Sequence, residues 1–234
     1  MAGKRFSLAV GIAGPTCAGK TTLAYRIIQL LARVQVGYLP QDAYYKDQGH
    51  LPPYARERIN YDHPAVLDLD LLAVHVEHLK GDPNSQVDMP VYDYATHTRG
   101  LATRIVKSAQ LILVEGTLIL TNEALRCLLD YKIYIDYPED IRLRRRMERD
   151  VAERGRTEKS VREQYYSTVK PMYEEFVVPS QQYADKIVFG DEDGMEVEAS
   201  FVGSLLRPRN GEARRGEGGP VLKMGVDRGV LVAV

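Results

Sequence analysis

The sequence predicts an α/β fold in which a parallel β-sheet carries helices on both faces. The first observation is that short apolar runs of strand length alternate with longer segments of helical periodicity. Because these runs are largely apolar, they suit strands buried on both faces, as in a parallel sheet. The second observation is a glycine-rich turn between the first apolar run and the first helix. Ligands of such folds bind beyond the carboxyl ends of the strands, so functional residues are expected there.

The predicted elements alternate along the chain. Strands are predicted over residues 8–13, 36–39, 111–114, 132–135 and 186–189. Helices are predicted over about 20–33, 66–79, 121–129, 138–154 and 160–169, and residues 195–206 are compatible with a last helix. Thr121 is a candidate cap for the third helix. Pro138 suits the first position of the fourth helix, which Gly155 follows.

Composition and length bound the function classes. The 234 residues fit one sizeable domain with an appendage, and 44% of them are apolar, which allows a real core. A net charge of −1 argues against a nucleic-acid partner. The two cysteines, Cys17 and Cys127, cannot build a disulfide framework. Apolar runs are too short to cross a bilayer, so the chain is expected to be cytoplasmic without a membrane partner.

The character of the sequence changes near residue 206. Residues 208–220 are rich in Gly, Arg and Glu and hold too few apolar side chains to order themselves, whereas residues 221–234 are again apolar without a clear period. The sequence therefore predicts a domain over residues 1–206 and a divergent, flexible tail over residues 207–234.

A phosphate-binding loop follows the first strand. Residues 14–21 match the pattern G-x-x-x-x-G-K-[ST] between a predicted strand and a predicted helix. Backbone N–H groups and the helix N-terminus would bind the phosphates of ATP or GTP, Lys20 would reach the terminal phosphates, and the Thr21 hydroxyl would bind Mg²⁺. The predicted nucleotide-binding residues are Gly14, Pro15, Thr16, Cys17, Ala18, Gly19, Lys20, Thr21 and Thr22. A guanine-reading Asn-Lys-x-Asp motif is absent from the sequence, which favours a small-molecule kinase over a GTPase.

Eight further short segments make the sequence resemble a known protein family. They are residues 40–45 (PQDAYY), 60–64 (NYDHP), 90–99 (PVYDYATHTR), 113–116 (LVEG), 150–156 (DVAERGR), 164–165 (QY), 169–172 (VKPM) and 183–185 (YAD). In this order, and with the phosphate-binding loop, they resemble the uridine kinase (uridine–cytidine kinase) family over roughly residues 6–189. The resemblance implies a P-loop NTPase-type parallel sheet with an Arg-rich helical lid, and ATP-dependent phosphorylation of the 5′-hydroxyl of uridine or cytidine.

The resemblance also implies roles on the acceptor side. Asp42 would be the catalytic base that faces the 5′-hydroxyl, although an Asp there could instead cap the following turn. Asp62 would accept hydrogen bonds from the ribose hydroxyls, with a cap before Pro64 as the alternative. Tyr92 and His97 would contact the pyrimidine base. Glu115 ends a buried strand and would bind Mg²⁺, or would form a salt bridge with Lys20 in an empty site.

The basic helix is the predicted lid, over about residues 142–165. Seven arginines lie between residues 142 and 158, namely Arg142, Arg144, Arg145, Arg146, Arg149, Arg154 and Arg156. By resemblance, Arg146, Arg156 and Gln164 contact the nucleoside, whereas Arg149 and Arg154 face phosphate and join Asp42 and Lys20 as catalytic residues. The alternative for such a run is a solvated helix face, and Arg142 and Arg144 are assigned to it.

The resemblance ends after Val188, where Pro-Arg-Gly is expected and Phe189-Gly190-Asp191 stands instead. Similar kinases are tetramers, so a homo-oligomer is expected. Two other functions stay open, a related kinase acting on another small alcohol such as a sugar phosphate, and a nucleotide-binding regulatory protein without turnover.

Overall fold

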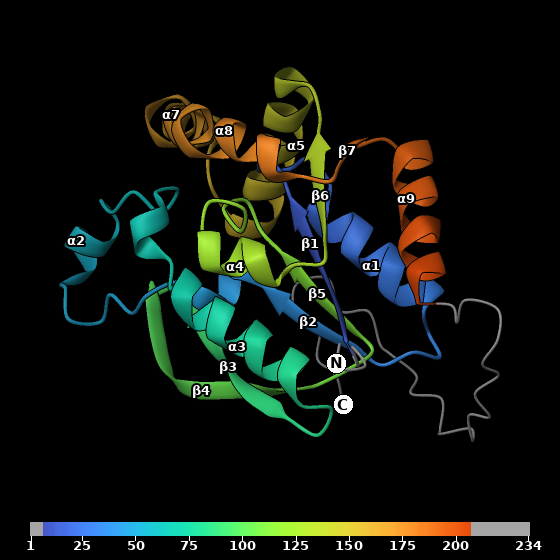
Figure 1. Ribbon diagram of the computed structural model, residues 1–234. Coiled ribbons are helices and arrows are strands. Elements are labelled where there is room, and N and C mark those ends of the chain that lie inside the picture. The colour runs from blue at the N-terminus through green and yellow to red at the C-terminus, as the bar shows by residue number, and fades with distance from the viewer. Residues whose placement is uncertain (1–6, 207–234) are drawn as a thin grey trace, which may run out of the picture.

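A five-stranded parallel sheet forms the centre of the molecule (Figure 1). The computed structural model describes residues 7–206, so the predicted tail over residues 207–234 lies outside the described residues. The strands, β1 (Leu8–Ala13), β2 (Val36–Pro40), β5 (Leu111–Glu115), β6 (Tyr131–Asp136) and β7 (Lys186–Phe189), are arranged in the order β2-β5-β1-β6-β7. The predicted α/β fold class and all five predicted strands are confirmed.

Alternate residues of the central strands enter two separate cores. On β1, Val10 and Ile12 pack against α1 (Lys20–Leu30) and α9 (Glu192–Leu205). Ala9 and Ala13 face the opposite side, which is covered by α3 (Leu69–Gly81) and α4 (Glu123–Leu128). The period of two along a strand therefore divides the helices into two layers around one sheet, as Figure 1 shows.

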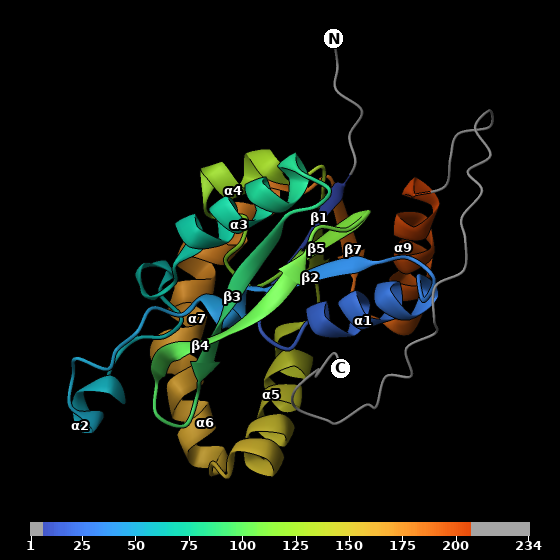
Figure 2. The ribbon, with the colours of Figure 1, turned by 90° about the horizontal axis from the view of Figure 1, so that it is seen from below.

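An antiparallel hairpin is the main element that the sequence did not predict. It comprises β3 (Gln86–Asp93) and β4 (Thr98–Lys107), which pair with each other in a second, two-stranded sheet. Its inner residues Val87, Met89 and Val106 join the core on the α3 side. In the view from below, the hairpin lies beside β2 and extends past the edge of the sheet (Figure 2). One face is buried and the other is open, which is the pattern of an antiparallel pair rather than of the continuous apolar runs used for prediction.

The predicted lid consists of two helices joined by a tight turn. They are α5 (Glu139–Arg154) and α6 (Glu158–Gln164), and Gly155 between them has a φ of 62°, the left-handed conformation that ends a helix. Helical backbone continues from α6 through η3 (Tyr165–Val169), α7 (Lys170–Met172), η4 (Tyr173–Val177) and α8 (Val178–Ser180) to η5 (Gln181–Tyr183). The segments η3 and η4 are π-helical, and each precedes a short α-helical segment with a proline, Pro171 or Pro179. Because proline donates no backbone hydrogen bond, a widened turn before it lets the helix continue.

Several predicted boundaries shift. Asn122, and not Thr121, caps α4, because its side chain accepts a hydrogen bond from the Leu125 N–H. Pro138 occupies the cap position of α5 rather than its first turn. Two short helical segments, α2 (Pro53–Arg56) and η2 (Pro64–Val66), precede α3, which begins at Leu69 after its cap Asp68. Among residues 7–206, none of the helices combines the length and the apolar character needed to span a membrane.

Gly14 should not tolerate a side chain. Its φ is 139°, and a Cβ atom would lie 2.4 Å from the carbonyl oxygen of Ile135 on β6. We therefore expect Gly14→Ala to lower the free energy of unfolding by at least about 2 kcal/mol. Gly100→Ala is the matched control, since a Cβ there meets no atom within 4 Å. Urea unfolding followed by circular dichroism measures both variants, and equal midpoints would contradict the expectation.

Candidate active site

The phosphate-binding loop connects β1 to α1. Gly19 precedes the helix with a φ of 107°, and Cys17 also has a positive φ of 58°. Such values cluster where backbone N–H groups turn toward a ligand. The segment after β7 approaches the loop closely, because a Cβ on Gly190 would lie 2.3 Å from the carbonyl oxygen of Ala18. The part of the chain where the resemblance ends therefore packs directly against the loop.

Two charged side chains lie beside this loop, the half-buried Lys20 and the buried Glu115. The Lys20 ammonium donates to the carbonyl oxygen of Pro15 at 2.9 Å. Burial lowers the pKa of Lys20, while Glu115 and Asp42 act in the opposite direction. Burial likewise raises the pKa of Glu115, and Lys20 opposes that shift. Each group is thus only partly compensated by the protein, which favours an anion at Lys20 and a cation at Glu115.

Glu115 also has two hydroxyl partners. Its Oε1 atom accepts hydrogen bonds from the Thr21 hydroxyl at 3.2 Å and from the Tyr38 hydroxyl at 3.0 Å. A carboxylate and a hydroxyl at a phosphate-binding loop are the hard oxygen ligands that Mg²⁺ prefers, and the ion usually keeps waters and substrate phosphates as its other ligands. Within residues 7–206 no group of three or more His, Cys, Asp or Glu side chains could hold a metal ion alone. The donor set at Glu115 therefore suits an ion that arrives with a nucleotide.

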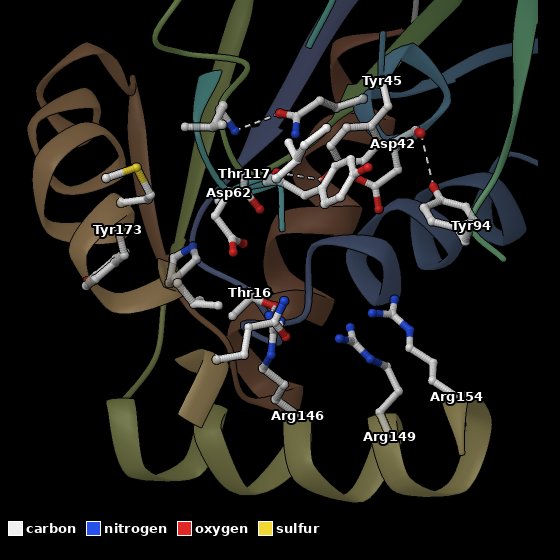
Figure 3. A pocket seen from close by; sticks show the side chains of 18 of the residues that line it. Thr16, Asp42, Tyr45, Asp62, Tyr94, Thr117, Arg146, Arg149, Arg154 and Tyr173 are labelled. Atoms are coloured by element: carbon white, nitrogen blue, oxygen red, sulfur yellow. Dashed lines mark hydrogen bonds between the residues drawn. The ribbon is translucent and has the colours of Figure 1, made fainter. Parts of the chain in front are cut away.

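A cavity of about 690 Å³ opens next to the loop (Figure 3). It extends from the start of the loop to the hairpin on one side and to α5 and η4 on the other. The predicted site residues that line it are Pro15, Thr16, Asp42, Asp62, Tyr92, His97, Arg146, Arg149, Arg154, Arg156 and Gln164. The structure thus gathers residues from six separate segments around one space.

Asp42 lies in η1 (Gln41–Tyr44), immediately after β2. Its neighbour Gln41 is buried, and its Oε1 accepts a hydrogen bond of 2.7 Å from the backbone N–H of Leu118. The Tyr94 hydroxyl donates to the backbone carbonyl of Asp42 at 3.0 Å (Figure 3). These two bonds tie the segment to the loop after β5 and to the hairpin, while the Asp42 side chain stays open to the cavity.

Asp62 faces the cavity from the opposite side. Its Oδ2 atom accepts a hydrogen bond of 3.2 Å from the hydroxyl of Thr168, which the π-helical segment η3 presents. Burial raises the pKa of Asp62, and Arg146 opposes this shift most strongly. A half-buried carboxylate with one hydroxyl partner can accept further hydrogen bonds, as a diol would supply.

Aromatic side chains cover the hairpin end of the cavity. His97 and Tyr61 stack with ring centroids 4.4 Å apart, and the rings of Tyr45 and Tyr92 lie 5.0 Å apart. Asp93 places His97, because its carboxylate accepts bonds from the Ala95 N–H and the Thr96 hydroxyl, both at 2.8 Å, which form the turn before it. His97 has a φ of 55°, and burial lowers its pKa, so the ring is neutral near pH 7. Flat apolar faces and a neutral imidazole suit a planar heterocycle.

Arginines of the lid cover the remaining side. Arg146 donates to the Thr16 hydroxyl and to the side-chain oxygen of Gln164, both at 3.2 Å. Arg156 also donates to that Gln164 oxygen. Arg142, assigned above to a solvated face, is in fact buried, donates to the Tyr137 carbonyl oxygen and lies over the Tyr173 ring.

Sequence reasoning missed several residues at the site. Tyr45, Tyr61, Tyr94 and Thr117 line the cavity, Tyr38 and Thr168 hold carboxylates, and Asp150 contacts the lid arginines. Tyr61 and Tyr94 stand within motifs that were quoted above, so their neighbours gave a signal. Tyr38 and Thr168 gave none, because their contacts join segments far apart in the sequence.

The geometry supports transfer of a phosphoryl group between two bound molecules. Positive groups and a phosphate-binding loop lie at one end of the cavity, and a carboxylate with an aromatic pocket lies at the other. Phosphoryl transfer requires mainly positioning and neutralisation of charge, and both are provided by residues around this cavity.

Comparisons with known proteins agree with this geometry. The model of the Phosphoribulokinase / Uridine kinase family matches residues 9–191. A uridine kinase of Shewanella amazonensis is 47% identical over 184 residues, which are 76% of this chain and 85% of that protein. A uridine kinase of Lactococcus lactis is 38% identical over 203 residues, 86% of this chain and 98% of that protein. The fold resembles the solved phosphoribulokinase of Rhodobacter spheroides, with a TM-score of 0.56 at 16% identity over 83% of this chain and 75% of that one.

His97→Ala should weaken binding of a pyrimidine nucleoside by about tenfold and leave triphosphate affinity nearly unchanged, because the ring lies at the hairpin end of the cavity. His78→Ala, at an exposed position of α3, is the control. Isothermal titration with uridine and with a non-hydrolysable triphosphate measures both affinities. Loss of triphosphate binding alone would contradict the assignment.

Proposed function

The chain belongs to the Phosphoribulokinase / Uridine kinase family, and on that premise we propose that it transfers the terminal phosphoryl group of ATP, or of GTP, to the 5′-hydroxyl of uridine or cytidine with Mg²⁺ as cofactor. The products are UMP or CMP and the nucleoside diphosphate. The chain is therefore a phosphotransferase with an alcohol group as acceptor.

The observation that carries the proposal is one cavity with two kinds of binding group. Thr16 of the phosphate-binding loop and the Asp42 carboxylate line it together with the aromatic pocket around His97. Asp42 also lies close enough to Lys20 to affect its pKa. A hydroxyl held at Asp42 would thus face the terminal phosphate bound at Lys20, as an in-line displacement requires.

The site residues can then be assigned to the binding of the donor, the metal ion and the acceptor. The loop and Lys20 bind the phosphates of the donor, while Thr21 and Glu115 would hold Mg²⁺, which supplies charge neutralisation when bound. Asp62 would accept hydrogen bonds from the two ribose hydroxyls, and Tyr92 and His97 would bind the base. These contacts orient the 5′-hydroxyl.

Transfer itself depends on a proton and on negative charge. Asp42 would accept the proton of the 5′-hydroxyl as its oxygen attacks phosphorus. Arg149 and Arg154 would stabilise the negative charge that develops on the transferred group, because one guanidinium group can donate two parallel hydrogen bonds to phosphate oxygens. Arg146, Arg156 and Gln164 would contact the nucleoside from the lid side of the cavity.

The other two functions are not favoured. The two relatives described above, which match most of this chain, are uridine kinases, whereas the likeness to the solved phosphoribulokinase shows the fold alone. An assay of nucleoside diphosphate release with uridine, cytidine, ribulose 5-phosphate or no acceptor tests the proposal. Release that requires a pyrimidine ribonucleoside supports it, and release with the sugar phosphate alone overturns it.

Asp42→Asn should lower turnover by at least ~10²-fold while nucleoside affinity is kept, because an amide of nearly equal shape cannot accept the proton. Steady-state kinetics with uridine and titration of uridine binding give the two quantities. Asp88→Asn, at an exposed position of β3, is the matched control and should behave like the parent. Near-parent turnover of Asp42→Asn would remove Asp42 from the mechanism.

Glu115→Gln should raise the Mg²⁺ concentration needed for half-maximal turnover by about tenfold or more, because a neutral amide is a weaker ligand than a carboxylate. It should also lower the pKa of Lys20 further, since Glu115 is the group that most strongly opposes the effect of burial on Lys20. Turnover at graded Mg²⁺ concentrations gives the first quantity, and an unchanged Mg²⁺ requirement would contradict the assignment.

A further inference from the structure

Asp150 takes no part in the steps above, although its carboxylate is completely buried. It lies near the end of α5, one residue after Arg149. An ionised carboxylate is costly to bury unless charged or hydrogen-bonding partners surround it. The partners of Asp150 therefore indicate why the residue is there.

Four guanidinium groups surround this carboxylate. Arg149 contacts Oδ1 through two nitrogens, with Nε at 2.9 Å and Nη2 at 2.8 Å. Arg154 lies 3.5 Å from the same oxygen. On the other oxygen, Oδ2, Arg146 lies at 3.5 Å and Arg156 at 4.0 Å.

The backbone of Asp150 holds the same region. Its carbonyl oxygen accepts the N–H of Gly155, which caps α5, and the N–H of Arg156 at 3.1 Å. The chain therefore turns around Asp150 after α5, and this turn brings Arg156 back to its side chain, whereas Arg154 lies one helical turn further along α5 itself. The left-handed φ of Gly155 makes that turn possible.

All four arginines also line the cavity, and Figure 3 shows Arg146, Arg149 and Arg154 extending into it from one helix. Arg146 reaches the phosphate-binding loop at Thr16, and Arg146 and Arg156 both reach Gln164 on α6. The carboxylate thus lies at the centre of a network that joins the loop to both helices of the lid.

Charge explains why such a centre is needed. Four guanidinium groups in a small volume repel one another, and one carboxylate leaves the cluster with a net charge of +3. The remaining positive charge is available to the phosphates of a bound nucleotide. Without the carboxylate, charge repulsion would move the four side chains apart, and a bound ligand would have to bring them back into place.

We propose that Asp150 is a positioning residue that holds the four lid arginines, Arg146, Arg149, Arg154 and Arg156, in the places from which they meet phosphate and nucleoside before either ligand binds. The inference rests on the proposed function, because the arginines act there on the transferred phosphoryl group. Groups arranged in advance stabilise a transition state without reorganisation, so Asp150 affects turnover more than affinity.

Asp150→Asn tests the proposal, since the amide keeps the shape and removes the charge. We expect kcat to fall about 10- to 100-fold, the scale of a small misplacement of reacting groups, while the Kd of the triphosphate changes by less than about threefold. Asp150→Glu, which restores the charge, should recover part of kcat. Glu148→Gln is the matched control, because Glu148 is an exposed acid on the same helix and should give parent kinetics.

A wild-type measurement keeps the proposal open to refutation if Asp150→Asn does not fold. In ¹⁵N-arginine spectra of the ligand-free protein, the Nε–H signal of Arg149, assigned with Arg149→Lys, should exchange slowly with water. A rapidly exchanging Arg149 signal would overturn the proposal. Parent kcat in a folded Asp150→Asn protein, or an equal loss of kcat in Glu148→Gln, would overturn it too.

Failure of the proposed function gives a different result. If the wild-type protein turns over neither uridine nor cytidine but shows the protected Arg149 signal, the proposed substrates are wrong and the role of Asp150 in positioning arginines is supported. If it turns over uridine with an unprotected Arg149, the proposed function stands and the inference about Asp150 fails.

Discussion

The register of the parallel sheet is the constraint on which the site depends. Glu115 at the end of β5 is paired with Ile12 of β1 on one side and with Pro40 of β2 on the other. The phosphate-binding loop begins two residues after Ile12, and Asp42 follows Pro40 by two residues. Because the carboxyl ends of parallel strands meet at one edge, the loop, the buried acid and the proposed base come together. A slip of one residue would turn each side chain to the other face of the sheet.

Incomplete compensation of buried charge gives this edge its affinity for ligands. Lys20 and Glu115 are both shifted toward their neutral forms by burial, and each only partly restores the charge of the other. An anion at Lys20 and a cation at Glu115 relieve the same cost. A nucleotide bound with a metal ion satisfies both demands at once, so the charges that destabilise the empty site favour the loaded one.

In the lid, a buried charge of the protein is surrounded by several groups of opposite charge. A run of arginines on an isolated helix would repel and remain solvated, yet here one buried carboxylate, Asp150, draws four of them to the cavity. The helical segment that follows widens into π-turns before Pro171 and Pro179, and the first of these turns presents Thr168 to Asp62. Local irregularities therefore serve to aim side chains at the cavity.

The sequence by itself determined the strands, the main helices and the phosphate-binding loop, because each follows from a local period or a contiguous motif. Motif order also predicted many, though not all, of the residues that gather at the cavity, including Asp42 and His97. The hairpin escaped prediction because its half-buried strands lack a continuous apolar run. Only the tertiary structure decided the partners of Tyr38, Thr168 and Asp150, since their contacts depend on which distant side chains share a buried space, and such neighbours leave no mark on local sequence.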